Sequence, residues 1–123
     1  MSDNKNIRIL VTDDSMLMRS KLRMILEAEG YEVVGEAANG IEAIKKYKDL
    51  RPDLVTLDIL MPIKDGFQAL REIRAIDPAA KVIMVSSTLT KEKILEALKL
   101  GARNFLLKPF NHEALLKVVK SVI

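Results

Sequence analysis

Charged and hydroxyl side chains follow several of the short apolar runs in this 123-residue chain. Asp13-Asp14 comes directly after IRILVT, and Asp58 ends the run DLVTLD. Ser86 ends KVIMVS, and Lys108-Pro109 follows NFLL. Three carboxylates held close together repel one another, and each raises the pKa of its neighbours. A divalent cation relieves that repulsion, and an oxygen-only ligand set with few protein ligands suits Mg²⁺.

A carboxylate, a divalent ion and a lysine are the groups that proteins use for phosphoryl transfer, because the cations neutralise the phosphoryl oxygens during in-line attack. Asp58 is the natural nucleophile, since carboxylates form acyl phosphates directly, and Ser86 is placed to donate a hydrogen bond to a phosphoryl oxygen. Each residue alone also has an ordinary structural explanation, such as helix capping by Asp14 or a turn at Lys108-Pro109. Asp58 is harder to explain in that way, because it ends a buried strand and precedes apolar residues.

The apolar runs alternate with longer amphipathic stretches, which predicts five strand–helix units. The expected strands span residues 7–12, 31–37, 53–58, 81–86 and 104–107. The expected helices span residues 15–29, 41–50, 66–76, 90–100 and 112–123. Thr90 and Asn111 are expected N-caps, and Gly101 is an expected C-cap. Within the second helix, Ile41, Ile44 and Tyr47 are expected to be aligned along one side.

Continuous apolar strands joined by helices imply a parallel sheet with helices on both faces. Right-handed crossovers then give a single doubly wound α/β domain, which we expect to occupy residues 1–123. The strand at 31–37 is less apolar and is expected near an edge. Ligands of such sheets bind at the carboxyl ends of the strands, so the polar residues found there are expected to converge.

The composition is that of a globular protein and excludes several kinds of site, with 49% apolar and 30% charged residues. The absence of cysteine excludes a disulfide framework, a zinc–thiolate site and a cysteine nucleophile. A single histidine, His112, excludes a multi-histidine metal site. No P-loop, GxGxxG or GxSxG motif is present.

The expected location is the cytoplasm, without membrane contact. No apolar run approaches the ~18 residues of a membrane span, and the start MSDNKNIRIL lacks a signal-peptide pattern. The net charge is only +3, and the charges are mixed along the chain. This balance is weak evidence for nucleic-acid binding, and DNA contact is not expected.

The residues at the strand ends belong to motifs that are similar to those of a known family. Asp13-Asp14, LDILMP with Asp58, MVSS with Ser86 and LKPF with Lys108 resemble the receiver domain of two-component response regulators. NGIEAI, MP..DG and GA..FL.KP reinforce the resemblance, which runs through nearly the whole chain in order. It implies a flavodoxin-like (βα)5 fold and, since nothing is attached to the receiver, a chemotaxis regulator of the stand-alone kind.

The resemblance implies specific roles for the residues that match. Asp58 would accept a phosphoryl group from a CheA-like histidine kinase, and Lys108 would contact a phosphoryl oxygen. Ser86 would turn inward to bond the phosphoryl group, while Phe105 would act as the aromatic switch residue. The Lys108-Pro109 peptide bond is expected to be cis. The Mg²⁺ ligands would be Asp13, Asp14, Asp58 and the backbone carbonyl of Leu60.

Some positions depart from the pattern of well-known chemotaxis receivers. Phe105 stands where many carry tyrosine, Leu60 is apolar where others are polar, and Thr88 is neutral where some carry an acid. Hydrolysis of the acyl phosphate needs a water placed beside it. We therefore expect slow self-dephosphorylation, which calls for a dedicated phosphatase as partner.

The implied function is a signalling switch that assists its own phosphorylation and dephosphorylation, rather than an enzyme. Its target, a flagellar motor switch protein or another acidic partner, would bind the face made by the fourth helix, fifth strand and fifth helix, and a monomer is expected. The lysines expected on this face are Lys91, Lys93, Lys99 and Lys117. The alternatives are a receiver of a non-chemotaxis phosphorelay, one detached from a multidomain regulator such as a methylesterase, or a haloacid-dehalogenase-type aspartyl-phosphate phosphatase.

Overall fold

The structure is a computed structural model that describes residues 7–123. The strands are β1 Arg8–Thr12, β2 Glu32–Ala37, β3 Leu54–Asp58, β4 Val82–Ser86 and β5 Asn104–Leu107. The helices are α1 Met16–Ala28, α2 Gly40–Leu50, α3 Gly66–Ile76, α4 Lys91–Lys99 and α5 His112–Val122. Every predicted strand and helix is present, with its ends moved by at most one residue. The predicted start of the domain and the signal-peptide assessment rest partly on residues 1–6, which lie outside the described residues.

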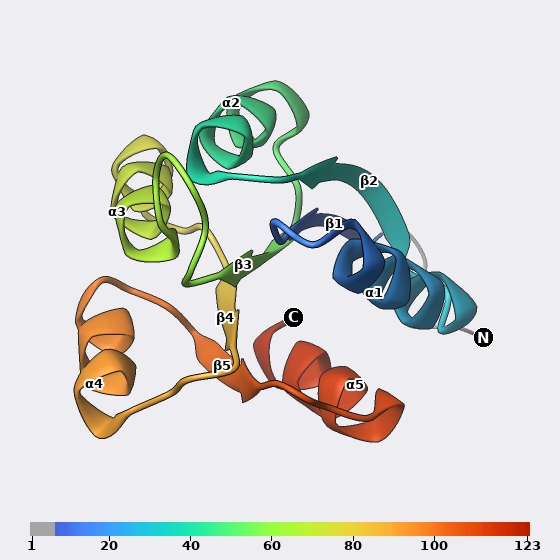
Figure 1. Ribbon diagram of the computed structural model, residues 1–123. Coiled ribbons are helices and arrows are strands. Elements are labelled where there is room, and N and C mark those ends of the chain that lie inside the picture. Colours follow the sequence, from blue (N-terminus) through green and yellow to red (C-terminus); the bar gives the residue numbers. More distant parts are fainter. Residues whose placement is uncertain (1–6) are drawn as a thin grey trace.

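The five strands form one parallel sheet in the order β2-β1-β3-β4-β5, so β2 is an edge strand as expected. Helices α2, α3 and α4 cover one face of the sheet, and α1 and α5 cover the other (Figure 1). This is the doubly wound, flavodoxin-like α/β fold that the sequence predicts. No helix within residues 7–123 is long and apolar enough to span a membrane.

Two apolar layers hold the helices against the sheet. Side chains that alternate along β1 and β4 divide between them: Leu10 and Met84 enter the layer under α2, α3 and α4, whereas Ile9 and Ile83 enter the layer under α1 and α5. Because both faces are covered, β3 and β4 are buried along their whole length. A sheet buried in this way exposes its polar chemistry only at the strand ends.

Side-chain caps start the helices where the sequence places them. Thr90 and Asn111 accept hydrogen bonds from backbone N–H groups in the first turns of α4 and α5, as predicted. The cap at the end of α4 is Leu100, and the predicted Gly101 follows it with a positive φ of 100°. Ile41 does not share the buried face of Ile44 and Tyr47 with which the sequence pattern aligned it, since 51% of it is exposed. The buried face of α2 starts instead from Gly40, which places Ile41 about 100° away around the helix.

Candidate functional site

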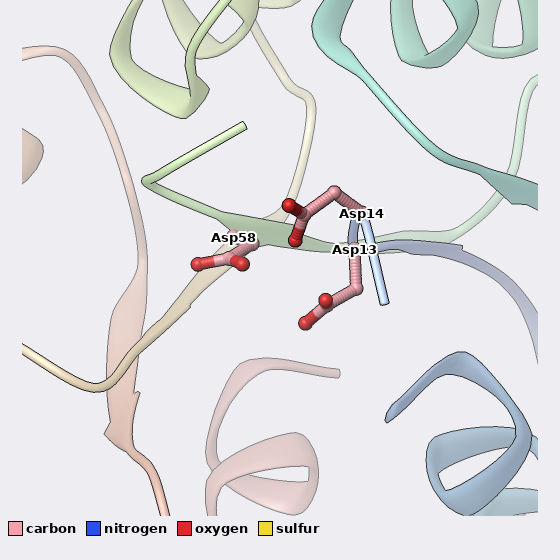
Figure 2. Close-up of side chains that lie close together, drawn as sticks. All are labelled: Asp13, Asp14 and Asp58. Atoms are coloured by element: carbon pink, nitrogen blue, oxygen red, sulfur yellow. The ribbon is translucent and has the colours of Figure 1, made fainter. Parts of the chain in front are cut away.

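The predicted acidic residues meet at the carboxyl ends of two neighbouring strands. Asp58 is the last residue of β3, and Asp13 and Asp14 follow β1 directly. Strands β1 and β3 pair in parallel, with Thr12 opposite Leu57, so their ends lie side by side. Figure 2 shows the three carboxylates gathered at these ends, and one carboxylate oxygen from each lies within 4.8 Å of the others.

Lys108 brings an ammonium group into this cluster from the end of β5. Its Nζ donates to Asp13 Oδ2 at 2.6 Å and to Asp58 Oδ2 at 3.2 Å. Asp13 is 1% exposed and Asp58 5% exposed, whereas Asp14 faces solvent. The predicted cis peptide bond joins Lys108 and Pro109. We call Asp13, Asp14, Asp58 and Lys108 the acidic cluster.

The charges of the acidic cluster are not balanced. Burial raises the pKa of Asp58, and the neighbouring charges of Asp13 and Asp14 raise it further, against the lowering effect of Lys108. Burial by itself would lower the pKa of Lys108, but its hydrogen bond to Asp13 and the charge of Asp58 raise it overall. Lys108 therefore stays charged, and a single ammonium faces three carboxylates.

The acidic cluster has the donor set of a hard divalent cation. All the candidate ligands are oxygen atoms, and the carboxylate of Asp14 has no hydrogen-bond or ion-pair partner among residues 7–123. The backbone carbonyl of Leu60 likewise accepts no hydrogen bond within the described part of the chain. A small set of oxygen donors with excess negative charge fits Mg²⁺, which retains several waters and is held by few carboxylates.

Two contacts that sequence reasoning missed hold Asp13 in place. The N–H of Ser15 donates to Asp13 Oδ1 at 2.9 Å, and the guanidinium of Arg19 donates to the carbonyl of Asp13 at 2.6 Å. Ser15, and not Asp14, is the N-cap of α1, which leaves the Asp14 carboxylate free of a capping role. The cap type was a signal for Ser15 in the sequence, but nothing in the pattern indicated Arg19.

Gly66 holds the end of β3 close to helix α3. Its N–H donates to the carbonyl of Ile59 at 2.8 Å, and a Cβ at this position would overlap the carbonyl oxygen of Asp58. Any larger residue would therefore displace the backbone that carries the Asp58 carboxylate. The MP..DG motif singled out in the sequence contains this glycine, and the close approach is the physical reason for it.

The remaining predicted residues lie around the acidic cluster without entering it. Ser86 ends β4 fully buried, and its Oγ accepts from the N–H of Thr88 at 3.2 Å. Phe105 is half-buried within β5 and packs against the core layer shared with α4. The side chain of Leu60 is 56% exposed beside the site.

The face of α4, β5 and α5 carries exposed cations and exposed apolar groups together. Of the predicted lysines, Lys91, Lys99 and Lys117 are exposed and Lys93 is half-buried. The sequence reasoning missed the apolar contribution of Leu95, Leu98 and Leu107, each about half exposed. Such a mixed surface is more typical of a binding face than of a solvated helix side.

Comparisons with known proteins find a family model and relatives that cover most of this chain. The family model described as the response regulator receiver domain matches residues 9–120. Protein CcdB of Bacillus subtilis is 49% identical over 116 residues, covering 94% of this chain and 97% of the relative. Chemotaxis protein CheY of Thermotoga maritima is 45% identical over 115 residues, covering 94% and 96% of the two chains.

A solved structure shares the fold closely. It is the complex of CheX with CheY, beryllofluoride and magnesium from Borrelia burgdorferi. The match has a TM-score of 0.93 and 36% sequence identity, and it covers 95% of this chain and 89% of the other.

Proposed function

Since this chain belongs to the response regulator receiver family, we propose that it accepts a phosphoryl group on Asp58 from a histidine kinase and serves as a signalling switch in chemotaxis. The observation that carries the proposal is the acidic cluster itself. Asp58 is a buried carboxylate at a strand end, with an ammonium 3.2 Å away and two further carboxylates beside it. Such an arrangement is costly for folding unless cations compensate the buried carboxylates.

In the transfer step, an Asp58 carboxylate oxygen attacks the phosphorus of a phosphohistidine. The new bond forms between that oxygen and phosphorus, while the bond from phosphorus to the imidazole nitrogen breaks and leaves its electron pair on the nitrogen. Lys108 lies within hydrogen-bond distance of Asp58 and donates to a phosphoryl oxygen as negative charge develops there.

The residues that would hold Mg²⁺ are Asp13, Asp14, Asp58 and the carbonyl of Leu60. When bound, the ion neutralises carboxylate and phosphoryl oxygens and so favours their close approach. The protein supplies the placement: Ser15 and Arg19 fix Asp13, and the contact of Gly66 with β3 fixes Asp58. Because these groups are held before the donor arrives, little reorganisation is needed during transfer.

The switch begins with the hydroxyl of Ser86. In the unphosphorylated protein its Oγ accepts the N–H of Thr88, so a turn toward a phosphoryl oxygen breaks that bond. The loop after β4 must then move to satisfy the released N–H, at a cost of about 1 kcal/mol. The charged phosphoryl group supplies the compensating hydrogen bond, and Phe105 would reorient with the loop.

The target binds the face of α4, β5 and α5 in this proposal. An acidic segment with apolar side chains, as on a flagellar motor switch protein, is complementary to Lys91, Lys99 and the exposed leucines. Several similar relatives carry the name chemotaxis protein CheY, which supports a chemotactic role. Phosphorylation can change the affinity for the target only by the difference in the target's binding free energy between the two states of the protein, which is typically about 1–3 kcal/mol.

Slow self-hydrolysis and a separate phosphatase complete the proposal. Leu60 and Thr88 are exposed beside the site, and neither offers a charged group to orient an attacking water. The related CheY of Borrelia burgdorferi forms a complex with another protein, CheX, which supports the expectation of a dedicated protein partner.

Labelling with acetyl phosphate and Mg²⁺ tests the assignment of the nucleophile. The wild-type protein is expected to gain one phosphoryl group by intact mass, and Asp58→Asn is expected to lose the label by about a thousandfold or more. Asp49→Asn, an exposed aspartate of α2, is the matched control and should label as the wild type does. Labelling of Asp58→Asn at an unchanged rate would contradict the assignment.

A further inference from the structure

Lys21 of α1 contacts the loop that carries Lys108. Its Nζ donates to the carbonyl of Phe110 at 3.2 Å and lies 4.8 Å from the centre of the Phe110 ring. The same ammonium therefore makes a hydrogen bond and a cation–π contact with one residue. This pairing connects two elements that are 89 positions apart in the sequence.

Phe110 anchors that loop in the hydrophobic core. It is 7% exposed and belongs to the core layer under α1 and α5, and it follows Lys108 by two residues. On the other side, the backbone N–H of Lys108 donates to the carbonyl of Ser86 at 2.8 Å. The short segment that carries Lys108 is thus held by β4 at one end and by α1 at the other.

The same helix also holds the opposite side of the site. Ser15, the N-cap of α1, and Arg19 in its first turn bind Asp13, while Lys21 binds Phe110. Ser15 and Lys21 are six positions apart, a separation of about 9 Å along a helix, and the helix keeps this distance nearly constant. Helix α1 therefore sets the distance between the Asp13 backbone and the loop from which the Lys108 ammonium reaches Asp13 and Asp58.

We propose that Lys21 is a positioning residue for Lys108: through Phe110 it holds the Lys108 ammonium at the correct place beside Asp58. The inference rests on the proposed function, because it assigns Lys21 a part in the same phosphoryl transfer. Lys21 touches neither Asp13 nor Asp58 among its described contacts. Lys21 is only partly buried, so removal of its charge is expected to leave the fold intact.

The test compares Lys21→Met, which keeps an unbranched apolar side chain but removes the ammonium, with Lys21→Arg, which keeps a cation for the Phe110 carbonyl and ring. Lys45→Met, an exposed lysine of α2, is the matched control for loss of one positive charge. The readout is the rate of labelling by acetyl phosphate at saturating Mg²⁺, in low and in high salt. Lys21→Met should label about three- to tenfold more slowly at both salt concentrations, because small displacements of catalytic groups slow a reaction strongly. Lys21→Arg should recover most of the rate, and Lys45→Met should match the wild type.

A labelling rate of Lys21→Met equal to that of Lys45→Met would overturn the proposal. A deficit that disappears in high salt would also overturn it, because it would show electrostatic attraction of the anionic donor rather than positioning. The second readout is the ¹⁵N resonance of the Lys108 ammonium in the unphosphorylated protein. Lys21→Met should shift this resonance and Lys45→Met should not; an unshifted resonance contradicts the positioning role.

The two readouts separate this inference from the proposed function. If the wild-type protein takes no label on Asp58, the proposed function fails whatever the Lys21 variants do. The resonance of Lys108 still decides whether Lys21 positions it. If the wild type is labelled and the Lys21 variants behave as the wild type does, only the role of Lys21 is lost.

Discussion

Two groups of charged residues at adjacent strands of the sheet differ in electrostatic balance: one has an excess of carboxylates and the other has equal numbers of cations and carboxylates. In the acidic cluster, the single ammonium of Lys108 faces the carboxylates of Asp13, Asp14 and Asp58. On β2, Glu36 accepts from Arg19 at 3.0 Å and from Arg23 at 2.8 Å, and Arg23 also binds Glu27. We call these last four residues the Glu36 cluster. Arg19 contacts both groups, because it also donates to the carbonyl of Asp13.

The pKa values of the two central carboxylates, Asp58 and Glu36, are shifted in opposite directions. Burial raises the pKa of Asp58. The hydrogen bond from Arg23 holds the pKa of Glu36 below its ordinary value, against the effect of burial. A carboxylate with two guanidinium partners stabilises the fold, whereas a buried carboxylate among like charges destabilises it. The difference indicates that the Glu36 cluster connects α1 to β2 and stabilises the fold, whereas the acidic cluster carries an electrostatic cost that the proposed function explains.

The largest expected effect is that of Lys108→Met on stability without Mg²⁺. The substitution leaves Asp13 and Asp58 buried without a cation, and loss of one partner from a buried ion pair typically costs about 3–5 kcal/mol. Since 15% of the Lys108 side chain is exposed, we expect a loss of about 2–4 kcal/mol in the free energy of unfolding by urea. Saturating Mg²⁺ should restore much of it. A loss no greater than that of Lys117→Met, an exposed lysine of α5, would mean that Lys108 does not compensate the carboxylates.

Asp58→Asn is expected to stabilise the metal-free protein by about 1–2 kcal/mol at neutral pH, within the range of common stabilising substitutions. The folded protein binds the Asp58 proton more tightly than the unfolded chain does, because the pKa is raised on folding. The penalty of the charged form is therefore complete above the folded pKa and disappears as the pH falls through it. Urea unfolding in chelator across this pH range measures the gain. A destabilised Asp58→Asn protein would contradict the electrostatic account of the cluster.

Glu36→Gln should lower the free energy of unfolding by a smaller amount, about 1 kcal/mol, because the pair is partly exposed. The pKa of Glu36 is lowered on folding, so its contribution is complete above the ordinary value of 4.5 and is lost as the pH falls through the folded pKa. The wild type and Glu36→Gln should thus converge in acid, whereas Mg²⁺ should not affect their difference. A difference that is constant with pH would show that the ionised pair is not responsible.

Much of the fold and of the site could be predicted from the sequence, because both depend on patterns along single segments. Apolar runs located the strands, and the parallel sheet then brought Asp13, Asp58 and Lys108 to one edge. Contacts between distant segments left no such pattern: the Lys21 contact with Phe110 spans 89 positions. The left-handed backbone of Ile63, with φ of 69°, was equally unexpected, since a β-branched residue disfavours that conformation.

The exposed leucines of the α4, β5 and α5 face illustrate the same limit. Periodicity identifies apolar residues in a helix, but it does not say which of them remain uncovered at the end of folding. Leu95 and Leu98 are about half exposed because Ala97 is the buried residue of α4. The sequence alone predicted the cations of this surface and not its apolar part.

The central claim is that carboxylates gathered at the strand ends require a divalent cation. The most direct test is the free energy of unfolding as a function of Mg²⁺ concentration, for the wild type and for Asp13→Asn. The wild type should gain about 1.4 kcal/mol for each tenfold increase in Mg²⁺ above the dissociation constant, as expected for one site in the folded state, and Asp13→Asn should gain much less. A wild-type stability that does not change with Mg²⁺ would contradict the claim.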